Sequence, residues 1–390
     1  MNATITQLDN LQASGEWTNW KWQQRNAIRS LEQLLQIFPA IPDDVCEAIK
    51  RTQTTRRLQI TPYTLTLIGR DASGAAPLPD DPLWRQFIPY WDTEGPGAHR
   101  YDGETENWEM PEEMVTPIAQ HKYDNRVIIR LSNVCHGYCQ FCYEALRTLE
   151  KDSNKLTFQQ EYWDATIDYL RGHEEIEEVI LSGGEPLMHG DQQIDAVLSD
   201  LRKLGRQIAI RIHTRALTFN PFRITDELVD VMRSYGLTAI GLHVTHPNEI
   251  TQEFRVAVDR LRRATPIMFA NIPLLAGVND NTDTLHKLGM MLYYVGVVPH
   301  YLYHFMPHSP GAVEFRTPVQ SGIDLVRSLK RHVTNLAVPE LVLPHQSGKY
   351  SIPLLAKDEL PPQRTTDENG NPFIRYTNWR GDIVEYPDDI

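Results

Sequence analysis

The feature that most constrains the fold is an alternation of apolar and amphipathic runs, which begins at residue 127. The apolar runs have the length of buried strands: residues 127–132, 179–182, 208–213, 239–244, 267–272, 297–304 and 341–343. Between them, hydrophobic residues recur at helical spacing, as in the series Ile194, Val197, Leu198 and Leu201. Strands and helices that alternate in this way predict an α/β fold with a parallel sheet and right-handed crossovers.

The number of strand–helix units limits the architecture. The six full units are too few for an eight-stranded barrel, so we expect an open or partial (β/α)6 barrel. In parallel α/β folds the binding groups gather at the carboxyl ends of the strands. Candidate binding residues follow the expected strands at these ends: Ser182, Gly183, Gly184, Glu185, Arg215, His243, His304 and Met306.

Three of the four cysteines, Cys135, Cys139 and Cys142, follow the first expected strand, and Phe141 precedes the last of them. A short run of thiols is typical of a soft-metal site. Structural zinc needs four ligands, usually in separated pairs, whereas Cys46 lies far upstream. A four-iron cluster held by three cysteines would leave one iron open, while an electron carrier uses four cysteines. The ligand count therefore favours a catalytic iron–sulfur cluster.

The regions that flank the alternating part have a different character. We expect residues 1–120 to form a helical and irregular region that wraps the barrel, which we assign to residues 121–345. Residues 346–390 form a C-terminal extension, in which two short β-prone runs predict a β-hairpin.

Composition narrows the class of protein. The net charge of −13 argues against a nucleic-acid partner, which needs basic patches. No apolar run has the length of a membrane span, and no secretory signal is visible at the N-terminus. Clustered rather than paired cysteines indicate a reducing compartment, so we expect a cytoplasmic protein without a membrane partner.

The cysteine spacing resembles that of the radical S-adenosylmethionine (SAM) superfamily, and Gly183-Gly184-Glu185-Pro186 looks like its SAM-binding loop. Two glycines would let the backbone approach a ligand, and Glu185 can accept a hydrogen bond from an ammonium group. The resemblance implies a 4Fe-4S cluster whose open iron binds SAM. It also implies a reductant such as flavodoxin or ferredoxin, and a 5′-deoxyadenosyl radical that abstracts hydrogen from a small-molecule substrate.

Several ordered segments narrow the resemblance to lysine 2,3-aminomutase and its relatives: residues 19–23, 60–63, 246–251, 277–280 and 315–319. The similarity extends over nearly the whole chain. It implies a partial barrel, a homo-oligomer, pyridoxal 5′-phosphate (PLP) as a second cofactor, and migration of an amino group from C2 to C3. Family members with structural zinc carry extra C-terminal cysteines; none follows Cys142, so we expect no such zinc.

The resemblance also assigns the PLP residues. Lys349, which follows Gly348, falls at the position of the PLP-binding lysine, although the loop is shorter than in the family and lacks its glycine run. Lys122 and Arg126 fall at basic positions that contact the PLP phosphate, and Tyr303 at a tyrosine near the cofactor. A lysine that binds PLP covalently must be placed accurately, so the short loop also permits a plain surface lysine.

The departures from the family concern the substrate. Glu144 stands where the lysine enzymes have an arginine that binds the substrate carboxylate. The substrate carboxylate is therefore either bound by another residue, with Arg147 as a candidate, or the substrate has no free carboxylate near Glu144. Met306 and Pro344 fall where two aspartates bind the distal ammonium of lysine. A buried unpaired ammonium is costly, so lysine is not the expected substrate.

Glutamate would need a positive charge from His304, His308 or His345, whereas a neutral or aromatic side chain suits Met306 better. The first hypothesis is a PLP-dependent aminomutase that makes a β-amino acid from a non-lysine α-amino acid. The second is a radical SAM enzyme, with or without PLP, that acts on a modified amino acid, amino sugar or peptide-like molecule. Its reaction would be an elimination, decarboxylation, dehydrogenation or epimerisation. The third is a non-catalytic iron–sulfur protein.

Overall fold

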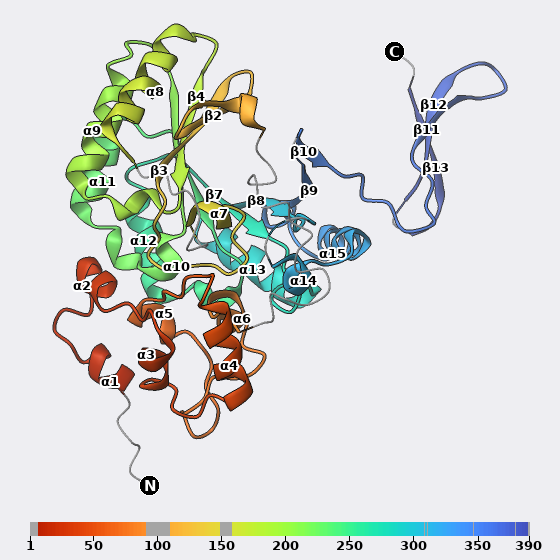
Figure 1. The fold of residues 1–390 in the computed structure, drawn as a ribbon. Coiled ribbons are helices and arrows are strands. Elements are labelled where there is room, and N and C mark those ends of the chain that lie inside the picture. The colour runs from red at the N-terminus through yellow and green to blue at the C-terminus, as the bar shows by residue number, and fades with distance from the viewer. Residues whose placement is uncertain are drawn as a thin grey trace.

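The computed structural model describes residues 7–90, 110–148, 158–307, 309, 311–345, 347–378 and 380–388. Its centre is a curved sheet whose strands follow one another in chain order (Figure 1). Seven consecutive strands of this sheet run parallel to one another: β3 (Arg126–Ser132), β4 (Glu178–Gly183), β5 (Ala209–Thr214), β6 (Ala239–His243), β7 (Ile267–Pro273), β8 (Val298–Tyr303) and β9 (Glu340–His345). The predicted α/β fold with a partial parallel barrel is confirmed.

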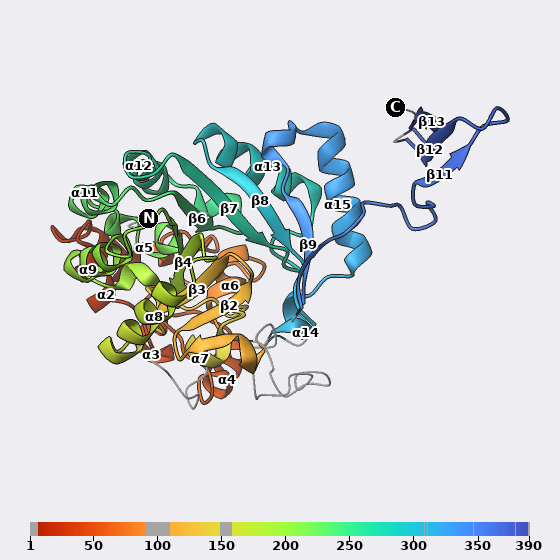
Figure 2. The same cartoon turned by 90° about the horizontal axis from the view of Figure 1, so that it is seen from above.

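Helices cover the outer face of the sheet, as Figure 2 shows from above. The longer ones alternate with the parallel strands: α8 (Gln160–Gly172), α9 (Asp191–Arg202), α11 (Asp226–Ser234), α12 (Gln252–Leu261), α13 (Thr282–Tyr294) and α15 (Val319–His332). Shorter helices lie in the connections: α7 (Ala145–Thr148), α10 (Ala216–Phe219) and α14 (Ala312–Phe315). Each long helix buries its apolar stripe against the strands, and the fully buried Trp163 and Phe254 belong to this core.

Antiparallel strands extend the sheet at both edges. At one edge are β1 (Met114–Thr116) and β2 (Ala119–Tyr123), and at the other is β10 (Gly348–Ser351). The expected domain boundaries after residues 120 and 345 therefore need correction, because the first falls inside β2 and the second inside the β9–β10 hairpin. The polar composition of β2 hid its strand character from the sequence pattern.

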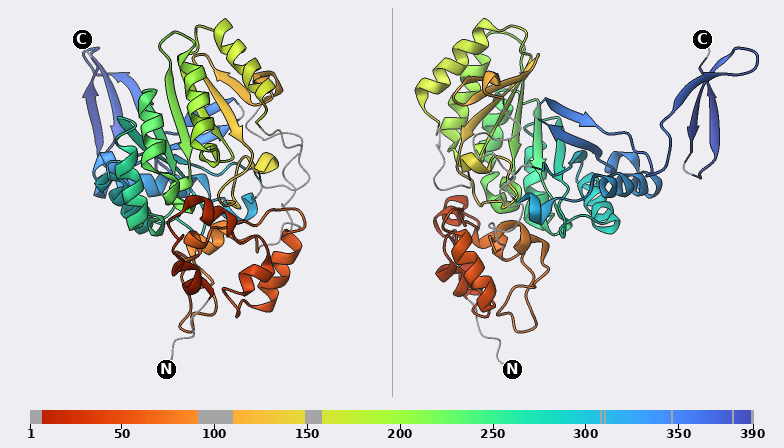
Figure 3. Two further views of the ribbon diagram at one scale, coloured as in Figure 1. Left: turned by 90° about the vertical axis from the view of Figure 1, so that its left-hand side faces the viewer. Right: turned by 45° about the vertical axis from the view of Figure 1, so that its right-hand side comes forward.

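The predicted N-terminal helical region is confirmed. It lies below the barrel in Figure 1 and again in both views of Figure 3. Its helices are α1 (Gln7–Gln12), α2 (Trp20–Arg25), α3 (Leu31–Leu35), α4 (Asp43–Thr52), α5 (Pro62–Leu65) and α6 (Pro82–Phe87). It has a hydrophobic core of its own, and Phe219 from the barrel joins that core.

The C-terminal extension forms a separate antiparallel sheet that projects from the barrel (Figure 1). The predicted hairpin corresponds to β12 (Pro372–Thr377) and β13 (Ile383–Pro387), and β11 (Gln363–Thr366) adds a third strand. None of the helices in the described ranges has the length and hydropathy of a membrane span.

Candidate active site

A cavity of about 430 Å³ runs along the inside of the curved sheet to the carboxyl ends of the strands. Residues from the first to the last strands of the sheet line it, so segments far apart in sequence share one space. Nearly all the site residues expected from the sequence lie on its wall: Lys122, Arg126, Cys135, Cys139, Phe141, Cys142, Glu144, Ser182, Gly183, Gly184, Glu185, Arg215, His243, Tyr303, His304, Met306 and Lys349. The exception is Arg147, whose side chain lies outside what the structure describes.

The three cysteines of the motif are only partly buried and face this cavity. Burial raises the pKa of the Cys135 thiol well above its usual value, and the nearby Cys142 raises it further. Among the described residues, no three His, Cys, Asp or Glu side chains gather around one metal ion. Cysteine thiolates are the usual ligands of iron–sulfur clusters, and all three line the same cavity. The thiols therefore fit an iron–sulfur cluster.

The N-terminal region fixes the backbone of the cysteine loop. The Gln59 side-chain amide donates to the carbonyl oxygens of Cys135 and His136, at 2.8 and 3.1 Å. The Tyr138 amide in turn donates to the Gln59 carbonyl at 2.9 Å. Gln86 repeats the arrangement, since its carbonyl accepts from the Gln140 amide at 2.8 Å. Residues before the barrel thus hold the loop in place, a role that the sequence pattern did not reveal.

The two glycines after β4 lie against the cysteine loop. A Cβ atom on Gly183 would come within 2.4 Å of the Ser132 carbonyl oxygen, and one on Gly184 within 2.7 Å of the Val134 carbonyl oxygen. Gly183 also has φ near +118°, which a residue with a side chain adopts only with strain. The glycines thus let the chain after β4 lie close to the end of β3 and the cysteine loop; both also line the main cavity, and the expected approach of a ligand to them stays a prediction.

Glu185 organises the next turn. Its carboxylate accepts from the Leu187 amide at 3.0 Å, the Thr214 hydroxyl at 2.7 Å and the Arg215 amide at 2.8 Å. Burial raises the pKa of this carboxyl above that of an ordinary glutamate. Glu185 therefore joins the ends of β4 and β5 at the cavity wall, where an ammonium group of a ligand would find an acceptor.

Arg215 links the cysteine loop to the barrel. Its Nη1 donates to Cys139 Sγ at 3.1 Å, and its Nη2 pairs with the fully buried Glu249 at 3.2 Å. The guanidinium also lies over the rings of Phe141 and Phe219, 5.1 and 5.8 Å from their centroids. A cation in this position would offset negative charge on a thiolate-bound cluster.

Lys349 lies in β10 and lines the same cavity as the cysteines. Although the residue as a whole is exposed, its amine sits 5.5, 5.6 and 6.0 Å from the ring centroids of Tyr301, Tyr303 and Tyr123. Burial of the amine, together with the charge of Arg126, lowers the pKa of Lys349 to about 8. An amine with this pKa between aromatic rings fits a lysine that binds an aldehyde cofactor such as PLP.

The cations near Lys349 differ in their availability to a phosphate. Lys122 is paired with Glu113, at 2.7 Å, so much of its charge is already offset. Arg126 lies 4.1 Å over the Tyr123 ring and forms no ion pair within the described part of the chain. Arg211, which the sequence reasoning missed, pairs with Glu178 at 2.8 Å and adds a second guanidinium beside Lys349. Arg126 is therefore a better candidate for a phosphate contact than Lys122.

Several buried polar atoms of residues on the cavity wall lack a hydrogen-bond partner within the described part of the chain, among them Nε2 of His213, Nε2 of His243 and Oδ1 of Asn271. Burial lowers the pKa of His243 to about 4 and that of His213 well below its usual value, so both imidazoles are neutral. Buried polar groups without partners are costly, and a bound polar ligand would satisfy them. The middle of the cavity therefore fits a polar organic cofactor.

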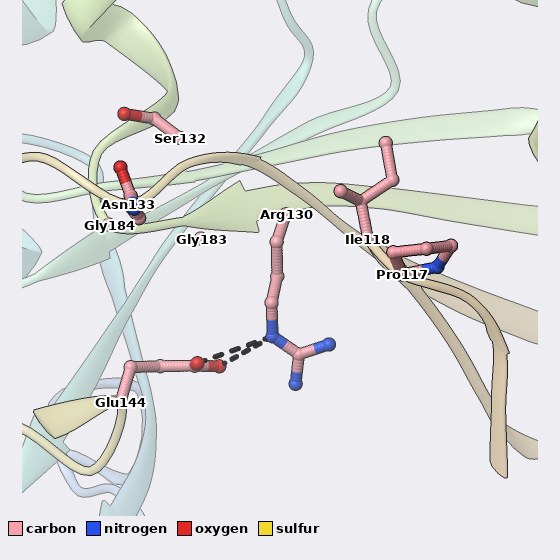
Figure 4. A pocket seen from close by; sticks show the side chains of 8 residues that line it. All are labelled: Pro117, Ile118, Arg130, Ser132, Asn133, Glu144, Gly183 and Gly184. Carbon is pink, nitrogen blue, oxygen red and sulfur yellow. Dashed lines mark hydrogen bonds and ion pairs between the residues drawn. The ribbon is translucent and has the colours of Figure 1, made fainter. Parts of the chain in front are cut away.

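Glu144 makes a buried ion pair with Arg130, another residue that the sequence reasoning missed (Figure 4). Nε of Arg130 donates to both carboxylate oxygens, at 3.1 and 3.2 Å. Glu144 lines the main cavity, whereas Arg130 lines a small neighbouring pocket. The wall near the third cysteine thus has an acidic residue backed by a cation.

The residues at the expected side-chain end of the substrate are mostly uncharged. Met306 and Pro344 both lie on the cavity wall, and Pro344 pairs with Lys349 in the β9–β10 register. His304 binds the Thr317 carbonyl oxygen at 2.9 Å, and burial lowers the pKa of His304. His345 is exposed and bonded to Ser347, while His308 lies outside the described residues. His304, with its lowered pKa, and His345, which does not line the cavity, are therefore poor sources of the cation that glutamate would need.

A signal for the missed residues was present in the sequence. Arg126, Ile128 and Arg130 alternate along β3, and Arg211 and His213 occupy the same kind of alternating positions along β5. Side chains two residues apart point to one face of a strand. Charged residues at alternate places in an otherwise apolar run thus indicate a strand whose inner face lines a polar cavity.

Comparison with known proteins agrees with this geometry. The Radical SAM superfamily model matches residues 129–288. The chain is 34% identical to the putative L-lysine 2,3-aminomutase of Aquifex aeolicus, over 95% of each chain. It is 32% identical to the L-lysine 2,3-aminomutase of Acetoanaerobium sticklandii, over 95% of this chain and 84% of that protein. It is 29% identical to the glutamate 2,3-aminomutase of Clostridioides difficile, over 96% and 83%. The chain therefore belongs to the lysine 2,3-aminomutase family of radical SAM enzymes.

Proposed function

We propose that this enzyme is a PLP-dependent 2,3-aminomutase that converts a non-lysine α-amino acid into a β-amino acid. The observation that carries the proposal is the shared cavity, which has the three cysteine thiols at one place on its wall and the Lys349 amine at another. A radical generated at the cysteines and an amino group held near Lys349 would then share one cavity.

When bound, the cluster with SAM supplies a 5′-deoxyadenosyl radical, and PLP supplies a carrier for the migrating amino group. The protein's own residues position both groups. Cys135, Cys139 and Cys142 would hold the cluster, with Arg215 beside Cys139. Lys349 would hold PLP between turnovers, because its lowered pKa leaves part of the amine unprotonated near neutral pH.

The cavity wall supports a substrate with a neutral side chain. Met306 and Pro344 provide no carboxylate for the distal ammonium of lysine. The lowered pKa of His304 leaves it neutral, so it provides no cation for the carboxylate of glutamate. A neutral aliphatic or aromatic side chain would bury apolar area against these residues without leaving a charge unpaired.

The proposal includes two partners. A reductant such as flavodoxin or ferredoxin would deliver the electron that starts each SAM cleavage. The enzyme is also proposed to form a homo-oligomer, and the projecting C-terminal sheet, with Ile383 71% and Tyr386 63% exposed, offers apolar area for contact with another copy.

The test uses anaerobically reconstituted protein with SAM, PLP and dithionite. We expect 5′-deoxyadenosine, the visible absorbance of lysine-bound PLP, and a β-amino product from at least one of the common amino acids or their amides. The Lys349→Ala variant should lose the PLP band and the product while still cleaving SAM, and Cys139→Ala should lose SAM cleavage as well. Absence of any β-amino product would count against the proposal.

A second candidate is a radical SAM enzyme that acts without PLP on a modified amino acid, amino sugar or peptide-like molecule. The ion pair between Lys122 and Glu113 favours it, because that pair weakens one expected phosphate contact. The two candidates differ in the absorbance spectrum. Protein that takes up no PLP but still cleaves SAM would support the second candidate.

A further inference from the structure

The ion pair of Glu144 and Arg130 lies at the cavity wall, close in sequence to the third cysteine, Cys142. Glu144 directly precedes α7 and lines both the large cavity and the small pocket shown in Figure 4. Arg130 comes from β3 and is absent from the wall of the large cavity. It lines the small pocket instead, together with Glu144, Gly183 and Gly184. A ligand in the large cavity therefore meets Glu144 first.

Hydrogen bonds to neighbouring residues hold the Arg130 side chain in its place beside Glu144. Nη2 of Arg130 donates to Oε1 of Gln120 at 3.1 Å, while Nε2 of Gln120 donates to Glu113 at 2.7 Å. Because Glu113 takes the amide NH2 of Gln120, the amide oxygen must face Arg130. The Arg130 and Glu144 side chains are only 5% and 3% exposed. Removing either partner from such a buried pair leaves a charge without compensation, so the pair is expected to persist when substrate binds.

The pair excludes some ligand chemistries and favours others. A free carboxylate against Glu144 would place two like charges together in a poorly solvated site. A full cation would be attracted to Glu144 but repelled by Arg130 directly behind it, because the pair has no net charge. A neutral N–H group is repelled neither by the charge of Glu144 nor by that of Arg130, and it can donate a hydrogen bond to a carboxylate oxygen.

We propose that the substrate presents a carboxamide, as in an amino-acid amide or a peptide-like compound, to Glu144 in place of a free carboxylate. Glu144 is then the specificity-determining residue that accepts from the amide N–H, and Arg130 is the residue that positions it. This inference rests on the proposed aminomutase function and names the substrate class for the same cavity.

The experiment compares L-leucinamide with L-leucine, since both have the neutral side chain that Met306 and Pro344 favour. Binding is measured by calorimetry on enzyme loaded with cluster, SAM and PLP, without reductant, so that no turnover occurs. We expect the amide to bind at least tenfold more tightly than the acid. Equal binding, or tighter binding of the acid, would overturn the inference.

Two variants sharpen the test. Glu144→Gln keeps an oxygen that can accept from Arg130 but adds an N–H donor, so the preference for the amide should fall to near unity. The double variant Arg130→Leu/Glu144→Arg moves the single cation to the cavity wall, so the acid should now bind more tightly. Glu178→Gln, which alters another carboxylate of the same cavity that is paired with arginine, should leave the ratio unchanged. An unchanged ratio in Glu144→Gln would overturn the inference.

Different experimental results would overturn the proposed function and this inference. Enzyme that binds PLP, cleaves SAM and makes a β-amino acid from a free α-amino acid, while preferring leucine over leucinamide, would overturn the inference alone. Enzyme that prefers leucinamide but yields no β-amino product from any amide or acid would overturn the function alone.

Discussion

The Lys349 amine should lose its proton about two pH units below an ordinary lysine. Burial of the amine and the nearby guanidinium groups of Arg126 and Arg211 disfavour the ammonium form and lower the pKa of Lys349 to about 8. At pH 7.5 about a quarter of the Lys349 amines would be unprotonated, compared with roughly 0.1% for a lysine with the usual pKa. Lys349 should therefore react with electrophiles roughly two hundred times faster than that reference on protonation grounds alone.

Competitive acetylation measures this property without any cofactor. A trace of isotopically labelled acetic anhydride reacts only with unprotonated amines, and mass spectrometry of the peptides gives the labelling of each lysine as a function of pH. The exposed Lys203 is the internal control, because its hydrogen bond to Asp200 raises its pKa. We expect a midpoint near pH 8 for Lys349 and a clearly higher midpoint for Lys203.

A change of charge at Arg126 tests whether its guanidinium helps to lower the pKa of Lys349. The Arg126→Gln variant removes a neighbouring positive charge, which makes the ammonium form less unfavourable, so the midpoint of Lys349 should move upward. Arg126→Lys keeps the charge and should leave the midpoint nearly unchanged. If Lys349 in the unaltered protein titrates together with Lys203, the amine is not held between the tyrosine rings and the reasoning fails.

Three further predictions concern the rest of the site and the core. Gly183→Ala would place a Cβ 2.4 Å from the Ser132 carbonyl oxygen and force a positive φ on alanine, so iron content after reconstitution and 5′-deoxyadenosine yield should both fall at least tenfold. Arg215→Met leaves Glu249 buried without its cation, which should cost about 3–5 kcal/mol in urea unfolding. Adding Glu249→Gln should recover part of that loss, and no recovery would show that the pair is not coupled. Phe254→Ala empties a fully buried position under the sheet and should cost about 3–5 kcal/mol by the same assay, with SAM cleavage retained at low temperature.

Sequence periodicity was a sound guide to the barrel because its strands and helices are long and bury continuous apolar faces. The periodicity did not predict the antiparallel strands at the edges of the sheet. Residues 114–123 contain the two short strands β1 and β2; β2 has a polar composition, and its pairing with β3 comes from hydrogen bonds that no local pattern records. For the same reason the domain boundary expected after residue 120 falls inside β2, and the one expected after residue 345 falls inside the β9–β10 hairpin.

The sequence by itself determined the reaction class and the fold, because the spacing of Cys135, Cys139 and Cys142 and the strand–helix alternation are local properties of the chain. It also marked Glu144 as the point of departure from the family. Only the tertiary structure showed that Arg130, fourteen positions earlier, pairs with Glu144, and that the Lys349 amine lies among three tyrosine rings from the two strands β2 and β8. Such contacts join residues that are distant in sequence, so they depend on strand register and burial, which exist only once the chain has folded.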